Sequence, residues 1–354
     1  MGNSHRSGTR EGNILNPSDL LNREEFELNF EAIKHHVEGR VVLITGAGGS
    51  IGSELCRQIV KLEPEKLILL GRGENSIYQI ERELLKSKIE ILGLIGDIQN
   101  KNRIEDIFSE HSPEIVYHAA ASKHVPLMEN NPSEAVLNNI IGTKNLVDMA
   151  HKYGTHEFVM ISTDKAVKPS SVMGASKRIA ELLVQSMNRQ SNTRFSIVRF
   201  GNVLGSRGSV VPLFLEQIEK GGPITITDKE MTRYFMTIPE ASKLVIQAGA
   251  YATGGEIFIL DMGEPVKIVD LAYRMMELAG KTVDIEEVGI RPGEKIHEEL
   301  MSKSEVVRDQ VLPKTFISTS KPRKKEEVLS LIVSLFGLSD LDLKRAIVYE
   351  ANQF

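Results

Sequence analysis

The stretch "RVVLITGAGGSIGSELCRQIV", residues 40–60, decides the fold of this chain. It starts with a short run typical of a buried strand, Val41 to Thr45, passes through a glycine-rich turn and enters a helical pattern. Backbone N–H groups in such a turn, together with the start of the helix, favour binding of a pyrophosphate. A glycine turn without a ligand is the alternative. The stretch therefore predicts a dinucleotide site made by Gly46, Gly49, Ser50, Ile51 and Gly52.

Further apolar runs follow at intervals, namely "KLILL", "EILGLIGD", "EIVYHAAA", "EFVMIST" and "FSIVRF", with helical patterns between them. This alternation predicts an α/β fold with a Rossmann-like, doubly wound parallel sheet. After Gly201 the alternation weakens, which indicates a smaller C-terminal substrate lobe. The expected parts are an N-terminal extension (1–36), the Rossmann domain (37–200, with sheet segments returning around 235–262), an interleaved substrate lobe (201–320) and a C-terminal helical tail (321–354).

Composition excludes several classes of protein. The net charge of -5 over 354 residues disfavours nucleic-acid binding, and the single cysteine fits a reducing compartment. The nine histidines show no HxxxH or paired Cys/His spacing, so no metal site is expected. No apolar run is long enough to span a bilayer, so we expect a cytoplasmic chain. A longer native protein, anchored in a membrane through a missing N-terminal region, stays open.

The end of the second predicted strand bears on the choice of cofactor. An acidic residue that would hold the ribose of NAD is expected there, but Gly71 occupies that position and Arg72 follows it. An arginine suits the 2'-phosphate of NADP, while Glu74 keeps NAD possible. A solvated loop arginine is the alternative. We therefore expect NADP or NAD, with NADP slightly favoured.

Six segments in chain order carry a resemblance to a known family: "ASKHVPLMENNP", "NIIGTKNLV", "STDKAVKPSSVMGASK", "RFGNVLGSRGSVVPLF", "MTRYFMTIPEA" and "RPGEK". Together they resemble the polysaccharide-biosynthesis group of nucleotide-sugar dehydratases in the extended short-chain dehydrogenase/reductase superfamily, and most closely the UDP-N-acetylglucosamine 4,6-dehydratases. The resemblance implies a tightly bound, regenerated cofactor, UDP-N-acetylglucosamine as substrate, and a homo-oligomer. It also implies cofactor contacts from Asp97, Ile98, Ala119, Ala120 and Lys177.

One departure from the superfamily pattern concerns proton transfer. A tyrosine is expected four residues before Lys177, but the chain has Met173, whose thioether cannot take or give a proton. One interpretation is an inactive relative of the enzymes. The other is that Thr163, Asp164 and Lys165 carry the proton chemistry, since they follow a predicted strand and can face the sugar. A surface ion pair at the strand end is the structural alternative for Asp164 and Lys165.

The reaction that the resemblance implies needs a base at C5 of the sugar, an acid at the C6 hydroxyl and a group at the C4 hydroxyl. Related enzymes have an Asp-Glu pair where this chain has Asp164 and Lys165. We assign Lys165 to the C5 proton, because burial and the nearby Lys177 would favour its neutral form. Asp164 is assigned to the C6 hydroxyl, and Asp164 or a Thr163 relay to the C4 proton.

Substrate contacts are expected from side chains that suit a UDP-sugar. Guanidinium groups match phosphate oxygens, and a carboxylate can accept ribose hydroxyls. For each single residue, a salt bridge or a solvated loop is the alternative. The candidates are Lys123, His124, Asn202, Arg233, Arg291 and Glu294. The predicted function is a 4,6-dehydratase that retains the C5 configuration. Its rivals are an inverting dehydratase, a UDP-sugar 4-epimerase and a non-catalytic NADP-binding sensor.

Overall fold

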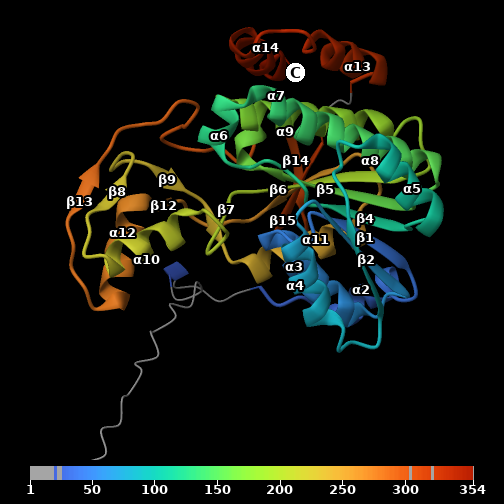
Figure 1. Cartoon of the computed structure of the whole chain (residues 1–354), viewed down its shortest axis with the longest axis horizontal. Helices are drawn as coiled ribbons and strands as arrows, with labels where there is room; N and C mark the ends of the chain where they lie inside the picture. Colours follow the sequence, from blue (N-terminus) through green and yellow to red (C-terminus); the bar gives the residue numbers. More distant parts are fainter. Residues whose placement is uncertain (1–19, 22–25, 303–304, 320–322, 354) are drawn as a thin grey trace, which may run out of the picture.

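The computed structural model describes residues 20–21, 26–302, 305–319 and 323–353 of the chain. Its largest element is a nine-stranded sheet with the strand order β14-β15-β11-β6-β5-β4-β1-β2-β3 (Figure 1). The strands from β11 to β3 in that order pair in parallel. Their bounds are β1 (Val41–Thr45), β2 (Lys66–Gly71), β3 (Glu90–Ile95), β4 (Ile115–His118), β5 (Glu157–Thr163), β6 (Arg194–Phe200) and β11 (Ile257–Leu260).

The direction of strand addition reverses at β1. From β1 the chain adds β2 and β3 on one side and then returns to add β4, β5 and β6 on the other. Thr45 at the end of β1 is level with Leu70 of β2 and His118 of β4. Sheets of this kind bind ligands at the carboxyl ends of the strands beside such a reversal. This edge of the sheet is therefore where a site is expected.

Helices cover both faces of the sheet (Figure 1). Val42 and Ile44 belong to the core on one face, while Leu43 belongs to the core on the other, as the two-residue period of a strand requires. This arrangement confirms the predicted α/β class with a doubly wound sheet. One face carries α2 (Phe30–Val37), α3 (Ser50–Ile59), α4 (Glu74–Leu84) and α11 (Ile238–Tyr251), and the other carries α5 (Lys101–His111), α8 (Gly142–Lys152) and α9 (Val172–Met187).

The start of α9 is set by a side-chain cap. Ser171 Oγ accepts a hydrogen bond of 3.0 Å from Gly174 N, which satisfies one of the N–H groups that the first turn leaves unpaired. A cap of this kind stabilises a helix by about 1 kcal/mol. Because α9 begins at this position, Met173 and Lys177 lie one turn apart on the same side of the helix.

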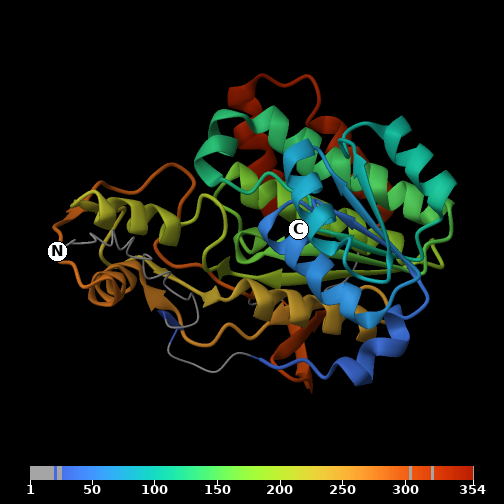
Figure 2. The ribbon, with the colours of Figure 1, turned by 60° about the horizontal axis from the view of Figure 1, so that its bottom comes forward.

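The range proposed as the substrate lobe contains a small core of its own. Phe214 and Ile218 of α10 (Val210–Glu219) pack with Leu271 of α12 (Ile268–Ala279). The lobe lies beside the main sheet (Figures 1 and 2). Its short strands pair as β7 (Asn202–Val203) with β10 (Phe235–Met236), β9 (Thr232–Arg233) with β12 (Val266–Lys267), and β8 (Ile224–Ile226) with β13 (Ile285–Glu287).

Later segments return to the main sheet. The strand β11 lies within the range 235–262 where returning segments are expected, and it pairs with β6. The strands β14 (Val306–Leu312) and β15 (Thr315–Thr319) extend the sheet beyond β11 in antiparallel pairing. An interleaved lobe over 201–320 is expected from the sequence, and residues 306–312 and 315–319 of that range lie in the main sheet. β14 and β15 are neighbours in the chain and pair with each other, but β15 joins the sheet through β11, which lies far away in the chain. The local pattern therefore does not show that the two strands belong to the main sheet.

Two helices form the end of the chain, α13 (Lys325–Ser334) and α14 (Asp340–Asn352), and both lie over α9 (Figure 1). Leu331 and Ile347 belong to one apolar cluster with Ile179 and Leu183 of α9. Since the main sheet covers its other side, α9 is buried along most of its length. The helix that carries Met173 and Lys177 is therefore held from both sides.

Candidate active site

The glycine turn between β1 and α3 has the shape that a pyrophosphate requires. Gly46 has a φ of +67°, and a Cβ there would lie 2.7 Å from Ala120 N, closer than real side chains approach. A Cβ on Gly52 would collide with the carbonyl oxygen of Gly46. Gly49 N donates to Gly46 O at 2.8 Å, so the turn leads directly into α3 at Ser50. The backbone can approach a phosphate closely here, which fits the predicted dinucleotide.

The other cofactor candidates near the glycine turn follow β2 and β3. Arg72 Nη1 lies 3.6 Å from Asp97 Oδ2, and the Arg72 side chain is 67% exposed. Ile98 is buried against Gly142, where a Cβ would lie 2.5 Å from Ile98 Cδ1. The structure therefore brings Arg72 and Asp97 together at one edge of the site. The choice between NADP and NAD stays a prediction.

A cavity of about 520 Å³ lies at the carboxyl ends of the central strands. Segments that follow β1, β4, β5 and β6 line it, together with residues from the smaller lobe. The predicted site residues among its lining are Gly49, Ser50, Ile51, Gly52, Ala119, Lys123, His124, Thr163, Lys165, Lys177, Asn202, Arg291 and Glu294. Gly46, Arg72, Asp97, Ile98, Ala120, Asp164 and Arg233 are not among the lining residues.

The three residues predicted to transfer protons form one cluster at the end of β5. Lys165 Nζ donates to Asp164 Oδ1 at 3.0 Å and to Asn202 Oδ1 at 3.1 Å, and Thr163 Oγ1 donates to Asp164 Oδ1 at 2.8 Å. Asp164 is fully buried, and its second oxygen, Oδ2, has no hydrogen-bond partner among the described residues. The Lys165 side chain is 19% exposed and lines the cavity. The cluster is therefore a charged wall of the cavity rather than a surface ion pair.

Met173 and Lys177 face the same cavity from α9. Lys177 Nζ donates to the carbonyl oxygen of Ile161 at 2.7 Å. Burial lowers the pKa of Lys177 to about 8, although the Glu181 carboxylate opposes this. Met173 is buried and has only a thioether to present. The position that a tyrosine would occupy therefore supplies packing and no proton.

Asn139, which the sequence analysis did not assign, ties the segment after β4 to α9. It lies in a π-helical segment, η2 (Val136–Ile141), a type of distortion often found at functional sites. Its Nδ2 donates to Ser122 O at 3.0 Å and to Ser176 Oγ at 2.9 Å, and its Oδ1 accepts from Ser122 N at 2.8 Å. In the sequence, the two adjacent asparagines Asn138 and Asn139 within an apolar helical run could have indicated this contact.

Lys123 and His124 lie after the end of β4, as the sequence predicts, and both line the cavity. Burial lowers the pKa of Lys123, and the nearby Arg207 guanidinium adds to this effect. Burial also lowers the pKa of His124, with a further contribution from Lys123. A neutral His124 beside a cationic lysine suits contact with an anionic or polar ligand.

A short segment after β7 lies against the glycine turn. Arg207 N donates to Ser50 Oγ at 3.2 Å, and the Arg207 guanidinium donates to the carbonyl oxygen of Gly48. From the other side, Lys123 Nζ donates to Arg207 O at 2.9 Å and to Ser206 Oγ at 3.3 Å. The segment therefore bridges the turn after β1 and the loop after β4. The sequence analysis did not assign Arg207.

The two arginines proposed for the pyrophosphate lie in different surroundings. Arg291 lines the cavity and forms an ion pair with Glu294, Nη2 to Oε1, at 2.5 Å. Arg233 is buried, and its guanidinium donates to the carbonyl oxygens of Thr232, Ile296 and Lys295 at 2.7, 3.0 and 2.8 Å. In this structure Arg233 holds the loop at 295–296 and does not line the cavity.

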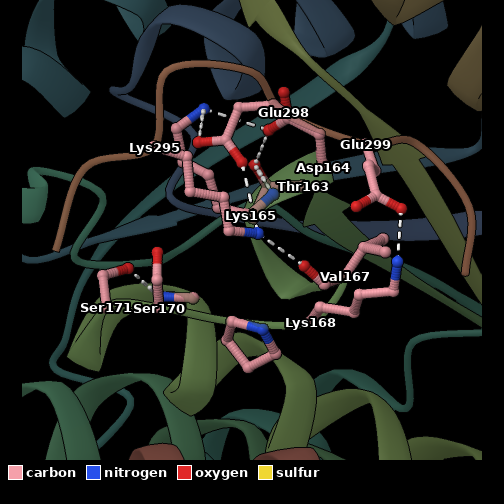
Figure 3. A network of polar contacts seen from close by, with 12 residues as sticks. Thr163, Asp164, Lys165, Val167, Lys168, Ser170, Ser171, Lys295, Glu298 and Glu299 are labelled. Carbon is pink, nitrogen blue, oxygen red and sulfur yellow. Dashed lines mark hydrogen bonds and ion pairs between the residues drawn. The ribbon is translucent and has the colours of Figure 1, made fainter.

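That loop delivers a carboxylate that the sequence analysis did not assign. Glu298 has a side chain only 4% exposed, and its Oε1 lies 3.9 Å from Lys165 Nζ. Its Oε2 lies 3.6 Å from Lys295 Nζ and has no hydrogen-bond partner among the described residues. Figure 3 shows Asp164, Lys165, Lys295 and Glu298 in one polar network. The charged run after "RPGEK" was the available signal, but which of its residues points inward depends on the fold.

The described part of the chain contains no group of three or more His, Cys, Asp or Glu side chains arranged to hold a metal ion. It contains no helix that is both long and apolar enough to cross a membrane.

The sheet order and the glycine turn define the class of this protein. It has a Rossmann-like α/β fold, which also occurs in a dTDP-glucose 4,6-dehydratase from Streptomyces venezuelae, with a TM-score of 0.66 and 20% identity over 72% of this chain and 86% of that one. A family model described as "Polysaccharide biosynthesis protein" matches residues 42–320. The chain belongs to this polysaccharide biosynthesis family.

Individual relatives agree with this assignment. The capsular polysaccharide biosynthesis protein CapD of Staphylococcus aureus is 58% identical over 90% of this chain and 54% of its own length. The probable polysaccharide biosynthesis protein EpsC of Bacillus subtilis is 52% identical over 94% and 57%. The chain thus spans little more than half the length of these two relatives.

More distant relatives align over most of their own length. A UDP-N-acetylglucosamine 4,6-dehydratase (inverting) of Campylobacter jejuni is 35% identical over 75% of this chain and 79% of its own length. The X-ray structure of Pen from Bacillus thuringiensis superposes with a TM-score of 0.74, at 35% identity over 84% of this chain and 98% of that one.

Proposed function

We propose that this chain is a nucleotide-sugar 4,6-dehydratase that acts on UDP-N-acetylglucosamine for polysaccharide biosynthesis. The family and the relative that carries this activity at 35% identity support the substrate class. The observation that carries the proposal is the cluster of Thr163, Asp164 and Lys165 at the cavity wall. Dehydration needs an acid and a base close together, and this cluster offers both.

The glycine turn and Lys177 are the residues proposed to hold NADP or NAD. When bound, the dinucleotide supplies a hydride acceptor and donor. Lys177 would hold the nicotinamide ribose from α9, and Arg72 with Asp97 would lie at the adenosine end. The exposed Arg72 guanidinium supports the slight preference for NADP, because it suits a 2'-phosphate.

The proton steps are assigned to the cluster at the end of β5. Lys165 Nζ takes the C5 proton as a neutral amine and becomes an ammonium. Asp164, as a carboxylic acid, is the source of the proton for the C6 hydroxyl, which leaves as water. Because Asp164 is fully buried, this proton reaches the cavity through the Thr163 hydroxyl, which lines it. The Thr163 hydroxyl, which donates to Asp164 Oδ1 at 2.8 Å, relays the C4 hydroxyl proton towards that carboxylate. Asn202 orients Lys165 through the contact at 3.1 Å.

We further propose that the configuration at C5 is retained. Inversion requires a proton donor on the opposite face of the sugar ring, and a phenol at position 173 would be suitable. Met173 lines the cavity but has no proton to give. Lys165 is then the residue that both removes and returns the C5 proton, from one face. The product is UDP-2-acetamido-2,6-dideoxy-4-keto-D-xylo-hexose.

Incubation of the protein with UDP-N-acetylglucosamine and mass spectrometry of the product tests the proposal. Loss of one water is expected. An unchanged mass would contradict dehydration, and an epimerised sugar of unchanged mass would establish the 4-epimerase alternative. Proton NMR of the fresh product tests the stereochemistry: an L-arabino 4-keto sugar formed first would establish the inverting alternative. Bound cofactor without any sugar product would favour the non-catalytic sensor. The homo-oligomer and the cellular location stay predictions.

A further inference from the structure

Glu298 is a buried carboxylate that the mechanism above does not use. It reaches the cluster from a loop of the smaller lobe, whereas Asp164 and Lys165 follow β5. Its Oε1 lies 3.9 Å from Lys165 Nζ, on a side chain that is 4% exposed. A carboxylate so close to an ammonium, with little water to screen it, attracts it strongly.

The loop that carries Glu298 is held in place by contacts of its own. Arg233 donates to the carbonyl oxygens of Lys295 and Ile296, and Thr232 N donates to Ile296 O at 3.0 Å. Lys295 Nζ donates to the carbonyl oxygen of Val167, which lies just after the proton-transfer cluster, at 2.9 Å. The position of Glu298 beside Lys165 is therefore built by the fold and does not result from one flexible side chain.

The charges around Glu298 nearly balance. Asp164 and Lys165 face it from the end of β5, Lys295 from its own loop, and the Arg233 guanidinium from β9. If Lys165 becomes a neutral amine, Glu298 loses the attraction of an ammonium that lies 3.9 Å away and keeps the Lys295 ammonium at 3.6 Å. The buried carboxylate is then less well compensated, so it takes up a proton more readily. The protonation states of Glu298 and Lys165 are therefore linked, as those of closely coupled sites are.

We propose that Glu298 is a positioning residue that controls the protonation of Lys165, holding its ammonium at rest and taking up a proton when Lys165 becomes the neutral base. This inference rests on the proposed role of Lys165 as the C5 base. Burial raises the pKa of Glu298, against the opposing effect of the Lys165 ammonium, so this carboxylate takes up a proton more readily than an exposed one. Its Oε2 accepts no hydrogen bond from the described residues and offers a place for that proton.

The test compares Glu298→Gln with Glu299→Gln in the full chain. Glu299 is the next residue, and its carboxylate pairs with Lys168 at 2.7 Å, away from Lys165. With Glu298→Gln, Lys165 loses a neighbouring negative charge, so its neutral form persists to lower pH. The acid limb of the kcat/KM profile should shift down by about one pH unit or more, the scale of a nearby opposite charge. Glu298→Asp should restore the wild-type profile in part, and Glu299→Gln should leave it unchanged.

A second measurement does not depend on turnover. The rate of acetylation of Lys165 by acetic anhydride, followed against pH by peptide mass spectrometry, reports its neutral fraction directly. Its midpoint should fall in Glu298→Gln and not in Glu299→Gln. The proposal would be overturned if Glu298→Gln reduced kcat at all pH values but moved neither the acid limb of the kcat/KM profile nor the midpoint of Lys165 acetylation. Glu298 would then have a structural role. Absence of dehydration by the wild type would refute the proposed function, while the acetylation midpoints would still decide the link between Glu298 and Lys165.

Discussion

Two buried charge clusters lie on either side of Ser162 and Thr163 at the end of β5, and they differ in how completely they are paired. In the first, Arg199 donates to Glu181 at 2.7 and 2.8 Å and to Glu305 at 2.9 and 3.1 Å, and Ser162 Oγ donates to Glu181 at 2.6 Å. None of these carboxylate oxygens is among the buried atoms without a partner in the described chain.

In the second cluster, Asp164 and Glu298 each keep one buried oxygen without a hydrogen-bond partner among the described residues. Lys165 of this cluster lines the cavity, whereas the charged side chains of the first cluster, Arg199, Glu181 and Glu305, are not among the lining residues. A buried polar atom without a partner costs about 1–3 kcal/mol, so it is retained where chemistry needs it. In the first cluster every buried carboxylate oxygen has a partner, as expected of a structural network. In the second, carboxylate oxygens beside the cavity lack hydrogen-bond partners in the described chain, as expected of a catalytic cluster.

Removal of Lys165 should abolish most of the activity of the cluster that borders the cavity. In Lys165→Met the C5 proton has no acceptor, so we expect turnover to fall by about 10²–10⁴-fold, the usual contribution of a general base. Binding of cofactor and UDP-sugar should persist, and solvent deuterium should no longer enter at C5. Steady-state kinetics, ligand titration and NMR check these results. Near-normal turnover would remove Lys165 from the mechanism.

Substitution in the first cluster should reduce the stability of the protein and leave its activity nearly unchanged. Arg199→Met leaves Glu181 and Glu305 as buried carboxylates without their main partner, which typically costs about 3–5 kcal/mol. Urea unfolding should show this loss, while activity per folded molecule changes little. As a control, Glu181→Leu and Glu305→Leu are added to Arg199→Met. This triple variant should recover much of the stability, because it leaves no buried charge unpaired. A single variant as stable as the wild type would contradict the structural role.

The residues around the cavity can be predicted from the sequence better than the buried ion pairs of the first cluster. The glycine turn, Lys177 and the Thr163–Lys165 segment are local patterns, and the structure brings them to one edge of the sheet, as parallel strands require. Arg199 and Glu305 become important only through contacts between distant segments, so their spacing carried no signal. The charged run after "RPGEK" drew attention to Glu298 and Glu299 but did not show which of them points inward. Arg233 shows the reverse: its residue type suits a phosphate, but three backbone carbonyls hold its guanidinium.

The pH dependence of stability sharpens the contrast, because two buried glutamates should act with opposite sign. Although burial alone would raise it, the Arg199 guanidinium holds the pKa of Glu181 at about 2. Its contribution to stability is therefore complete above the unfolded pKa of about 4.3 and is lost as pH falls towards 2. Burial raises the pKa of Glu298, so its contribution is complete below about pH 4.3 and is lost as pH rises through the raised value.

Unfolding free energies measured from pH 2 to 8 check this contrast. Each proton that differs between the folded and unfolded states contributes a slope of about 1.4 kcal/mol per pH unit. Glu181→Gln should flatten the loss of stability on the acid side. Glu298→Gln should raise stability at neutral pH relative to acid pH. Shifts of the same sign in both variants would contradict the distinction between the two clusters.

The smallest effect on stability is expected at a third charge pair, which is open to solvent. Arg72 and Asp97 lie 3.6 Å apart, with Arg72 67% exposed, so Arg72→Ala should change the free energy of unfolding by less than about 0.5 kcal/mol. Affinity for NADP should nevertheless fall by an amount equivalent to about 1.5–3 kcal/mol, because a charge-assisted contact to the 2'-phosphate is lost. Affinity for NAD, which lacks that phosphate, should stay within twofold, and calorimetric titration of both cofactors into both proteins measures the difference. Equal weakening of NAD and NADP would show that Arg72 acts on the shape of the adenosine site, and unchanged NADP affinity would show that it is a solvated loop residue.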